Sequence, residues 1–150
     1  MKIRLEPVTV ASRAAVERLE TAPGPEGVGE SVAECLAEAD RRRCWRPVGV
    51  YDGDALIGFA MYGFFWEYLP FGRLWLDRLL IDRRFQGRGY GRAALAALLE
   101  RLEREYHKKR IYLSVVEANR PAAALYESFG FRFTGERDTH GERVMCLRTR

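Results

Sequence analysis

The fold is decided by one stretch of the chain, Leu74 to Leu102, which reads L-W-L-D-R-L-L-I-D-R-R-F-Q-G-R-G-Y-G-R-A-A-L-A-A-L-L-E-R-L. Its first part, Leu74 to Asp82, is mostly apolar and predicts a buried strand. Its last part predicts a long helix, because leucines recur at the spacing of one buried helical face. Glycines separate the two parts, so the stretch indicates a strand, a turn and a helix in succession.

The turn has the features of a site for a phosphorylated ligand. Gly87, Gly89 and Gly91 allow the backbone to approach a ligand closely, since glycine has no side chain to obstruct it. Amide groups at the start of a helix carry a partial positive charge, which favours an anion there. Arg88 and Arg92 stand among the glycines and add positive charge. A plain strand-to-helix turn is the alternative, but it would not need three glycines in five positions.

Two familiar phosphate-binding patterns fit this turn poorly. A P-loop requires Gly-Lys-Ser or Gly-Lys-Thr, whereas Gly91 is followed here by Arg92 and Ala93. A dinucleotide fingerprint could be forced onto Gly89, Gly91 and Ala94, but it would follow the first strand of a doubly wound unit. Here the turn follows the fourth predicted strand, and too little chain remains for the repeats of that fold.

The whole chain, residues 1–150, predicts one mixed α/β domain. No repeat, low-complexity tract or linker interrupts it, and clusters of Pro and Gly mark the loops. Outside the central stretch, the predicted elements are a strand Ile3–Val10, a helix from its N-cap Ser12 to Leu19, a loop Thr21–Gly29, a helix Val32–Arg43 capped by Ser31, a hairpin of strands Arg46–Tyr51 and Ala55–Phe65, a strand Ile111–Val116, a helix Asn119–Phe129, and a closing hairpin of Phe131–Arg137 and Arg143–Leu147.

Composition limits the location and the partners that we expect. No apolar run approaches the roughly 20 residues of a membrane span, and the N-terminus lacks the apolar block of a signal peptide. We therefore expect a cytoplasmic protein without a membrane partner. The net charge is +4, but basic residues alternate with glutamates, as in E-R-L-E-R-E-Y-H-K-K-R. This alternation favours a solvated face over a nucleic-acid surface. The three cysteines lie far apart without a C-x-x-C pattern, so we expect no disulfide and no metal.

Two motifs resemble the signatures of the GNAT acetyltransferases. The segment Gln86 to Gly91, Q-G-R-G-Y-G, resembles motif A of that family, whose pattern is Q/R-x-x-G-x-G/A. The segment Asn119 to Phe131, N-R-P-A-A-A-L-Y-E-S-F-G-F, resembles its second signature, and the predicted order of elements fits the family over the whole chain. The resemblance implies the GNAT fold, an α/β architecture whose mixed, mostly antiparallel sheet splays beside the motif A strand and carries flanking helices.

The same resemblance implies that acetyl-CoA is the co-substrate and lies along the motif A strand and turn. Backbone amides of the turn would bind the pyrophosphate, and the exposed main chain of the strand would pair with the pantetheine arm as an added strand does. Asn119 is a natural N-cap and would also contact the cofactor. The residues expected at the cofactor are Leu79, Leu80, Ile81, Gln86, Gly87, Arg88, Gly89, Tyr90, Gly91, Arg92 and Asn119.

Tyr126 is the general acid that the resemblance implies, placed to protonate the departing thiolate of CoA. It lies seven residues after Asn119, so the two share one helical face. A tyrosine packed on the core with its hydroxyl in water is the alternative. A main-chain N–H near Leu79 would polarise the thioester carbonyl and stabilise the oxyanion.

Asp77 is the base that the resemblance implies. An alkylammonium has a pKa of about 10.4 and cannot attack until it loses a proton, either directly to a base or through water. A salt bridge with Arg73 or Arg78 is the alternative role for this carboxylate. Strict alternation along the strand would place Asp77 on the same face as Trp75 and Leu79.

The acceptor implied by resemblance is a polyamine or another small primary amine. The segments W-L-D-R-L-L-I-D-R-R-F-Q-G-R-G-Y-G, I-Y-L-S-V-V-E-A-N and F-R-F-T-G-E resemble those of the bacterial spermine/spermidine (diamine) N-acetyltransferases. No cysteine lies in either signature, so we expect direct transfer in a ternary complex. A groove for a long cation could be lined by aromatic and acidic side chains. The candidates for this groove are Trp45, Tyr62, Phe64, Phe65, Trp66, Glu67, Tyr68, Glu30, Glu34 and Glu38.

Other functions stay open at this point. The acceptor could instead be a protein N-terminus, a lysine or a different small amine. A non-catalytic acyl-CoA-binding module would keep the same fold and the same glycine turn. The sequence does not decide the oligomeric state, so a homodimer is as open as a monomer.

Overall fold

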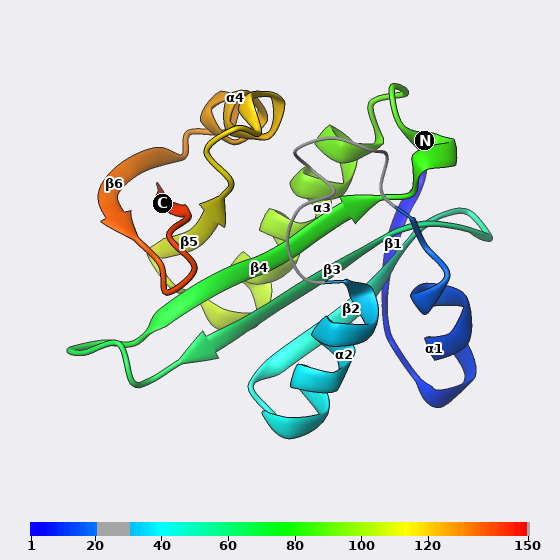
Figure 1. Ribbon diagram of the computed structural model, residues 1–150, viewed down its shortest axis with the longest axis horizontal. Coiled ribbons are helices and arrows are strands. Elements are labelled where there is room, and N and C mark those ends of the chain that lie inside the picture. The colour runs from blue at the N-terminus through cyan, green and yellow to red at the C-terminus, as the bar shows by residue number, and fades with distance from the viewer. Residues whose placement is uncertain (21–30, 150) are drawn as a thin grey trace.

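The computed structural model describes residues 1–20 and 31–149, so the predicted loop Thr21–Gly29 lies outside the described residues. Strands and helices follow one another in the predicted order. Figure 1 shows one sheet with helices on both of its faces. The elements are β1 (Ile3–Pro7), α1 (Val10–Glu17), α2 (Val32–Arg41), β2 (Trp45–Asp52), β3 (Ala55–Phe65), β4 (Arg73–Ile81), the short 3₁₀ helix η2 (Arg83–Phe85), α3 (Tyr90–Tyr106), β5 (Arg110–Val115), α4 (Arg120–Ser128), β6 (Arg132–Arg137) and β7 (Arg143–Arg148).

One seven-stranded sheet forms the framework, with the strand order β1-β2-β3-β4-β5-β7-β6. Neighbouring strands are antiparallel except β4 and β5, which run parallel. This arrangement confirms the predicted mixed, mostly antiparallel sheet with flanking helices. Because β7 lies between β5 and β6, the closing hairpin extends the sheet on the far side of the parallel pair.

The sheet splays between β4 and β5. The two strands pair only where Leu74–Leu76 meets Ile111–Leu113, although both continue beyond these residues. In Figure 1 β5 turns toward α4 while β4 continues in a different direction. Within the described chain, the later part of β4 therefore has a neighbouring strand on one edge and an opening on the other. A strand edge that is open in this way can pair with the main-chain-like amides of a ligand.

A second structural feature of β4 is a β-bulge at Asp77. Two consecutive residues of β3, Met61 and Tyr62, pair with Arg78 and Leu76, so Asp77 is the extra residue on β4. An extra residue breaks the alternation of side chains, because those that follow it exchange faces with those before it. The bulge thus changes which side chains of β4 face the opening.

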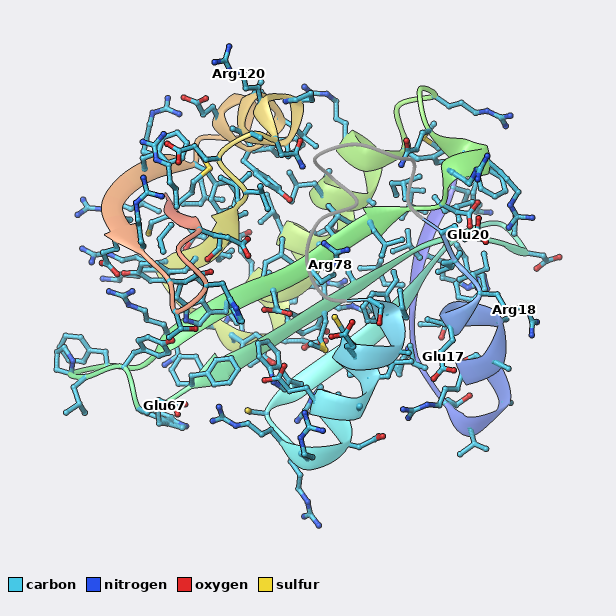
Figure 2. The ribbon with its side chains drawn as sticks, in the orientation of Figure 1. Glu17, Arg18, Glu20, Glu67, Arg78 and Arg120 are labelled. Atoms are coloured by element: carbon cyan, nitrogen blue, oxygen red, sulfur yellow. The ribbon has the colours of Figure 1, made fainter. Side chains whose placement is uncertain are left out.

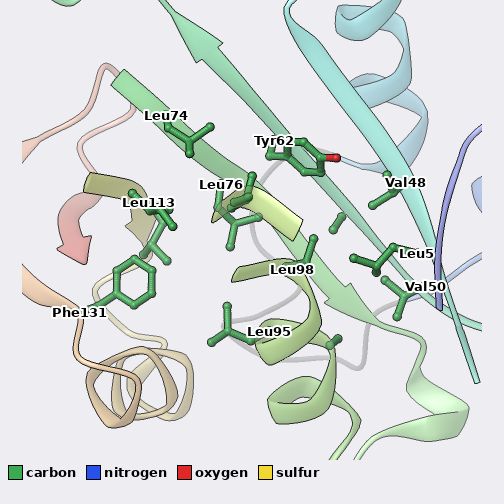
Figure 3. Packing of buried hydrophobic residues seen from close by; sticks show 14 of the residues in the cluster. Leu5, Val48, Val50, Tyr62, Leu74, Leu76, Leu95, Leu98, Leu113 and Phe131 are labelled. Atoms are coloured by element: carbon green, nitrogen blue, oxygen red, sulfur yellow. The ribbon is translucent and has the colours of Figure 1, made fainter. Parts of the chain in front are cut away.

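Two apolar cores hold the helices against the sheet. In the first, Leu95, Leu98 and Leu102 of α3 are fully buried, which confirms the predicted helical face. They belong to one cluster with strand residues and Phe131, and Figure 3 shows Leu95 and Leu98 of this cluster beside the sheet. The second core packs α1 and α2 on the opposite face and contains Val16, Leu19, Val32, Cys35, Leu36, Phe59, Met61 and Leu80. None of the helices in the described ranges is long and apolar enough to cross a membrane.

Three predicted helix boundaries are wrong near the N-terminus, and one of them is the end of α1, which lies at Glu17 and not at Leu19. Ser12 is not the N-cap of α1; Thr9 is, and the two residues form a reciprocal capping box. The chain must turn into this cap, so β1 ends at Pro7 and does not reach Val10. The second helix begins after its predicted cap Ser31 but ends two residues early, where the backbone becomes extended.

Candidate active site

A cleft of about 870 Å³ opens where β4 and β5 diverge. That volume is typical of a pocket for an organic ligand of substantial size. The cleft is walled by β4 and the glycine turn, by the end of β5 and α4, and by the turn between β6 and β7. The predicted site residues that line it are Asp77, Leu79, Leu80, Ile81, Gln86, Gly87, Gly89, Tyr90, Gly91, Asn119 and Tyr126.

The main chain of β4 presents hydrogen-bonding groups to this cleft. Asp82 donates its N–H to Ile57 of the β3 side at 2.8 Å, and Leu80 is two residues before it. Successive residues of a strand direct their main-chain groups to opposite edges, so Leu80 faces β3 while Leu79 and Ile81 face the cleft. We therefore expect the main chain of Leu79 and of Ile81, but not that of Leu80, to form hydrogen bonds with a cofactor. Leu80 is still one of the residues that line the cleft.

The glycine turn continues this edge. Gln86 donates a side-chain hydrogen bond to the Ile81 carbonyl at 3.0 Å, which fixes the start of the turn against the end of β4. Gly87 and Gly89 have φ angles of 77° and 83°, a left-handed conformation that favours glycine. Gly89 is the N-cap of α3 and supplies no side-chain cap, so the first amides of this 17-residue helix are left for an external acceptor. A phosphate group is a suitable acceptor at such a position.

Tyr90 anchors the start of α3 to the end of β2, which lies at the same end of the sheet as the glycine turn. Its hydroxyl donates to the Asp52 carboxylate at 2.5 Å, and the same carboxylate accepts the main-chain N–H of Lys2 at 2.8 Å. These bonds join the N-terminus, the turn after β2 and the first residue of α3. The amides of the glycine turn are therefore held by structure outside the cleft.

The two arginines of the turn are placed differently from the glycines. Arg88 lies over the ring of Phe85 with 5.7 Å between the guanidinium carbon and the ring centre. Arg92 donates to the Ser128 hydroxyl at 3.1 Å and lies over the ring of Phe129. Neither arginine is among the described residues that line the cleft. Both are exposed, so contact with a phosphate would require them to leave these partners.

Tyr126 enters the cleft from α4. The side chain of Asn119 accepts the N–H of Ala122 at 3.2 Å, which confirms the predicted N-cap, and Asn119 and Tyr126 line the same cleft. Burial raises the pKa of Tyr126 to about 12, while the positive charge of Arg78 acts in the opposite direction. The hydroxyl therefore keeps its proton at neutral pH and is available as a donor.

Asp77 is exposed at the bulge and lines the cleft. The predicted facing is wrong, because the bulge separates the residues that strict alternation would group together. Leu79 packs against the core around α3, whereas Trp75 contacts Tyr112 on the other face. Arg73 and Arg78 were the two predicted salt-bridge partners of Asp77. Of these two, Arg73 forms an ion pair with Glu136 of β6 at 2.8 Å.

Carboxylates from four parts of the chain line the cleft. They are Glu34 of α2, Asp77 of β4, Glu117 after β5, and Asp138 and Glu142 of the β6–β7 turn. Asp138 shapes its turn by accepting the main-chain N–H groups of His140 and Glu142, each at 2.9 Å. Sequence reasoning treated this turn only as a hairpin connection. Its position depends on the pairing of β7 with β5, which brings the turn beside the splay.

The predicted aromatic groove is not part of this cleft. Tyr62 is buried and donates its hydroxyl to the Glu105 carboxylate at 3.1 Å. Trp45 packs edge-on against Phe65, with 4.5 Å between ring centres. Glu30 lies outside the described residues. The aromatic candidates of β2 and β3 thus pack within the sheet and its hairpin, and the acidic residue of that set that does line the cleft is Glu34.

The cysteines are not among the described residues that line the cleft, and they form no disulfide in the described part of the chain. Burial raises the pKa of the Cys146 thiol, which makes this side chain a poor nucleophile at neutral pH. Within residues 1–20 and 31–149, no group of three or more His, Cys, Asp and Glu side chains is arranged to hold a metal ion.

Comparison with known proteins finds relatives over nearly the whole chain. Residues 13–131 match the acetyltransferase (GNAT) family. The chain is 45% identical over 148 residues to the spermine/spermidine N(1)-acetyltransferase of Bacillus subtilis (strain 168). This alignment covers 97% of each of the two chains.

Solved structures share the fold at lower identity. An acetyltransferase from Thermus thermophilus superposes with a TM-score of 0.75 at 22% identity, covering 99% of this chain and 98% of that chain. The PaiA N-acetyltransferase from Thermoplasma acidophilum, in complex with coenzyme A, superposes with a TM-score of 0.70 at 17% identity. That comparison covers 99% of this chain and 100% of the other.

Proposed function

This chain belongs to the acetyltransferase (GNAT) family, and from that premise we propose that it transfers the acetyl group of acetyl-CoA to a primary amine of a polyamine such as spermidine or spermine. One observation carries the choice of acceptor. The 45% identity to the Bacillus spermine/spermidine N(1)-acetyltransferase extends over 97% of both chains, so it includes the acceptor side of the cleft as well as the glycine turn.

Acetyl-CoA would lie along the edge of β4. The uncapped first amides of α3 and the left-handed glycines before it suit the pyrophosphate. The C=O of Leu79 and the N–H of Ile81 suit the amides of the pantetheine arm, which would pair with β4 as an added strand, while the N–H of Leu79 remains for the acetyl carbonyl. The Ile81 carbonyl already accepts a hydrogen bond from Gln86, so the arm would be held by the Leu79 carbonyl and the Ile81 N–H.

The acetyl carbonyl would then lie beside the bulge. We assign the Leu79 N–H as the donor that polarises this carbonyl and stabilises the tetrahedral oxyanion. The amine nitrogen attacks the carbonyl carbon, a C–N bond forms and the C–S bond breaks. Because the described cleft lining includes no cysteine, the acetyl group would pass directly from CoA to the amine in a ternary complex.

Two side chains would move the protons. Asp77 lines the cleft at the bulge and would accept the proton that the ammonium must lose, directly or through water. Tyr126 would give its proton to the departing sulfur, since its hydroxyl is protonated at neutral pH. The phenolate is later reprotonated from solvent.

The charge of the cleft supports a cationic acceptor. Carboxylates of α2, β4, the end of β5 and the β6–β7 turn line it, whereas Arg78 is the one lysine or arginine among the described lining residues. A polyamine carries several ammonium groups along a flexible chain. One terminal amine could reach the acetyl group while the others lie near these carboxylates, where opposite charges attract through a medium of reduced dielectric.

A panel of acceptors tests the proposal. Thiol release from acetyl-CoA should be measured with spermine, spermidine, putrescine, an aminoglycoside and short peptides with a free N-terminus or lysine. We expect kcat/KM to be highest for spermine or spermidine, at least about tenfold above the peptides, which corresponds to roughly 1.4 kcal/mol of transition-state preference. Initial rates at varied concentrations of both substrates should give intersecting double-reciprocal lines, as a ternary complex requires.

The same panel separates the alternatives. A preference for peptides would identify a protein N-terminus or lysine as the acceptor and would overturn the polyamine assignment. Binding of acetyl-CoA without thiol release from any amine would identify a non-catalytic acyl-CoA-binding module. Parallel double-reciprocal lines, together with an acetylated form of the protein, would contradict direct transfer.

A further inference from the structure

Arg78 stands beside the proposed point of transfer. It follows Asp77 on β4, precedes Leu79 and lines the cleft. Beyond the bulge, Arg78 shares its face of the sheet with Leu80, which packs against the core of α1 and α2. Figure 2 shows Arg78 near the middle of β4, on the face of the sheet turned toward the viewer. The transfer steps proposed for Asp77 and Tyr126 do not involve this arginine.

The guanidinium of Arg78 differs from those of nearby arginines on the chain, which form ion pairs. Arg73 forms an ion pair with Glu136, and Arg84 forms one with Asp82. Among the ion pairs within residues 1–20 and 31–149, none includes Arg78. Its Nε is buried and has no hydrogen-bond partner there. A buried donor without a partner is rare in native proteins and calls for a functional or structural explanation.

Arg78 of β4 and Tyr126 of α4 line the same cleft. Burial raises the pKa of the Tyr126 hydroxyl, and the positive charge of Arg78 opposes that shift. The other charged or titratable groups among the described residues that line the cleft are Glu34, Asp77, Tyr90, Glu117, Asp138, His140 and Glu142. Carboxylates would make a phenol a weaker acid, since negative charge disfavours the phenolate. Arg78 is the one permanently positive side chain among these described lining residues. Its charge therefore opposes the rise in the pKa of the Tyr126 hydroxyl.

We propose that Arg78 is a positioning residue that acts through Tyr126, its fixed positive charge keeping the hydroxyl acidic enough to protonate the sulfur of departing CoA. The inference rests on the proposed acetyl transfer. In the step concerned, the C–S bond of the tetrahedral intermediate breaks, the O–H bond of Tyr126 breaks and an S–H bond forms. Arg78 stabilises the negative charge that develops on the phenol oxygen as its proton leaves, and it gives up no proton itself.

A double-mutant cycle tests this dependence. The variants are Arg78→Met, Tyr126→Phe and the two together, with kcat measured by thiol release at saturating acetyl-CoA and amine. Arg78→Met should lower kcat about tenfold, which corresponds to a one-unit loss of acidity. Once Tyr126 is replaced, removal of Arg78 should have an effect of less than about twofold, because the two residues act as a unit. Losses that multiply, or an Arg78→Met variant within about twofold of wild type, would overturn the inference.

Two further variants separate charge from packing. Arg78→Lys keeps the charge and should retain most of the activity, whereas a merely structural role would not be rescued by lysine. Arg104→Met removes an exposed arginine of α3 outside the cleft and should leave kcat unchanged. Equal loss in the lysine and methionine variants would contradict a role for the charge.

A measurement without an acceptor keeps the test independent of the polyamine assignment. The thiol of CoA bound to the protein can be titrated by the ultraviolet absorbance of its thiolate, with desulfo-CoA as the blank. Arg78→Met should raise the midpoint of this titration by about one pH unit relative to wild type, because Tyr126 then donates a weaker hydrogen bond to the thiolate, and it should have no such effect when Tyr126 is replaced by Phe. Identical midpoints would overturn the inference. If the wild type acetylates no amine, the proposed function fails, and this titration still decides whether Arg78 acts on the sulfur.

Discussion

At the scale of single residues, the proposed reaction depends on two protons that move at different places in the cleft. Tyr126 approaches from α4 and Asp77 from the bulge of β4, and both line the same space. The spacing from Asn119 to Tyr126 could be evaluated from sequence, because helical periodicity is local. The side of the sheet that Asp77 faces could not be predicted from sequence, because the bulge arises from pairing with β3.

Tyr126→Phe should lower kcat about 100-fold, within the range that positioned general acids contribute. The phenyl ring keeps the shape of the side chain, so the dissociation constant for acetyl-CoA should change by less than about twofold. Stopped assays of thiol release and calorimetric titration with CoA provide the two measurements. Tyr51→Phe, on β2 and outside the cleft, is the matched control. Full activity of the Tyr126 variant would remove this residue from the role of acid.

Asp77→Asn should change the pH dependence of kcat/KM. Without the carboxylate, only amine that is already neutral in solution reacts, so the rate should rise about tenfold per pH unit up to the amine pKa of about 10.4. The deficit relative to wild type should therefore be largest at low pH and small near pH 10. Glu103→Gln, exposed on α3, should leave the profile unchanged. If the Asp77 variant has the wild-type profile at all pH values, the base lies elsewhere.

At the scale of elements, β4, the glycine turn and α3 form one continuous support for a cofactor. The strand, the turn and the helix were all predictable from Leu74 to Leu102, since apolar runs, glycines and a leucine face are local patterns. The splay that makes the edge of β4 accessible depends on how far β5 pairs with it. That distance is set by contacts between parts of the chain that are remote in sequence.

Gly91 allows the requirements of folding and of binding to be separated. It lies in the first turn of α3 and has no positive φ, and a Cβ there would meet Leu125 at an ordinary 3.8 Å. Gly91→Ala should therefore stabilise the protein, by up to about 1 kcal/mol. The same methyl group would stand where a phosphate approaches the amides, so CoA affinity should fall about tenfold or more, roughly 1.4 kcal/mol.

Gly53→Ala provides the opposite pattern. Gly53 has a φ of 58° in the turn after β2 and does not line the cleft. Alanine there should destabilise the protein by about 1 kcal/mol, because its left-handed conformation is unfavourable for a residue with a side chain, and should leave CoA binding unchanged. Thermal unfolding and calorimetry measure both quantities. A Gly91→Ala variant that binds CoA as tightly as wild type would contradict close approach of the phosphate at this turn.

Asp82 holds the end of β4 in place and gives this element a pH-dependent stability. It is 2% exposed and accepts hydrogen bonds from the Arg84 side chain and from the main-chain N–H groups of Arg84 and Glu20. Burial favours the neutral acid, but these hydrogen bonds outweigh it and hold the pKa of Asp82 below its usual value. A lowered pKa in the folded state stabilises the protein above the unfolded pKa of about 3.9, and this contribution is lost as the pH falls further.

Asp82→Asn should lower the free energy of unfolding at pH 7 by about 2 kcal/mol, as expected for loss of hydrogen bonds to a charged acceptor. The difference from wild type should shrink when the pH falls from 7 to the acidic range below the lowered pKa of Asp82, where the native carboxylate also becomes protonated. Urea unfolding at the two pH values measures this, with Asp54→Asn in an exposed turn as control. A difference that does not vary with pH would show that ionisation of Asp82 is not the source of the stability.

At the scale of the whole molecule, one sheet separates two apolar cores and opens between β4 and β5 to form the cleft. The order of elements and the mixed sheet were predictable from sequence, because each element has its own pattern and cap. Most of the carboxylates that line the cleft could not be predicted to lie there, since Asp138 and Glu142 reach the cleft only through the pairing of β7 with β5. The aromatic residues of β3 were misassigned to the acceptor because sequence alone does not distinguish a buried ring from one that lines a groove.

Acetyl transfer from acetyl-CoA to a polyamine is best tested by identifying the product. The purified protein is incubated with acetyl-CoA and spermidine, and free CoA and acetylated spermidine are both quantified, the latter by mass spectrometry. We predict that the two products accumulate in equal amounts and only when both substrates are present. The proposed function is contradicted if the protein binds acetyl-CoA but neither spermidine nor spermine becomes acetylated.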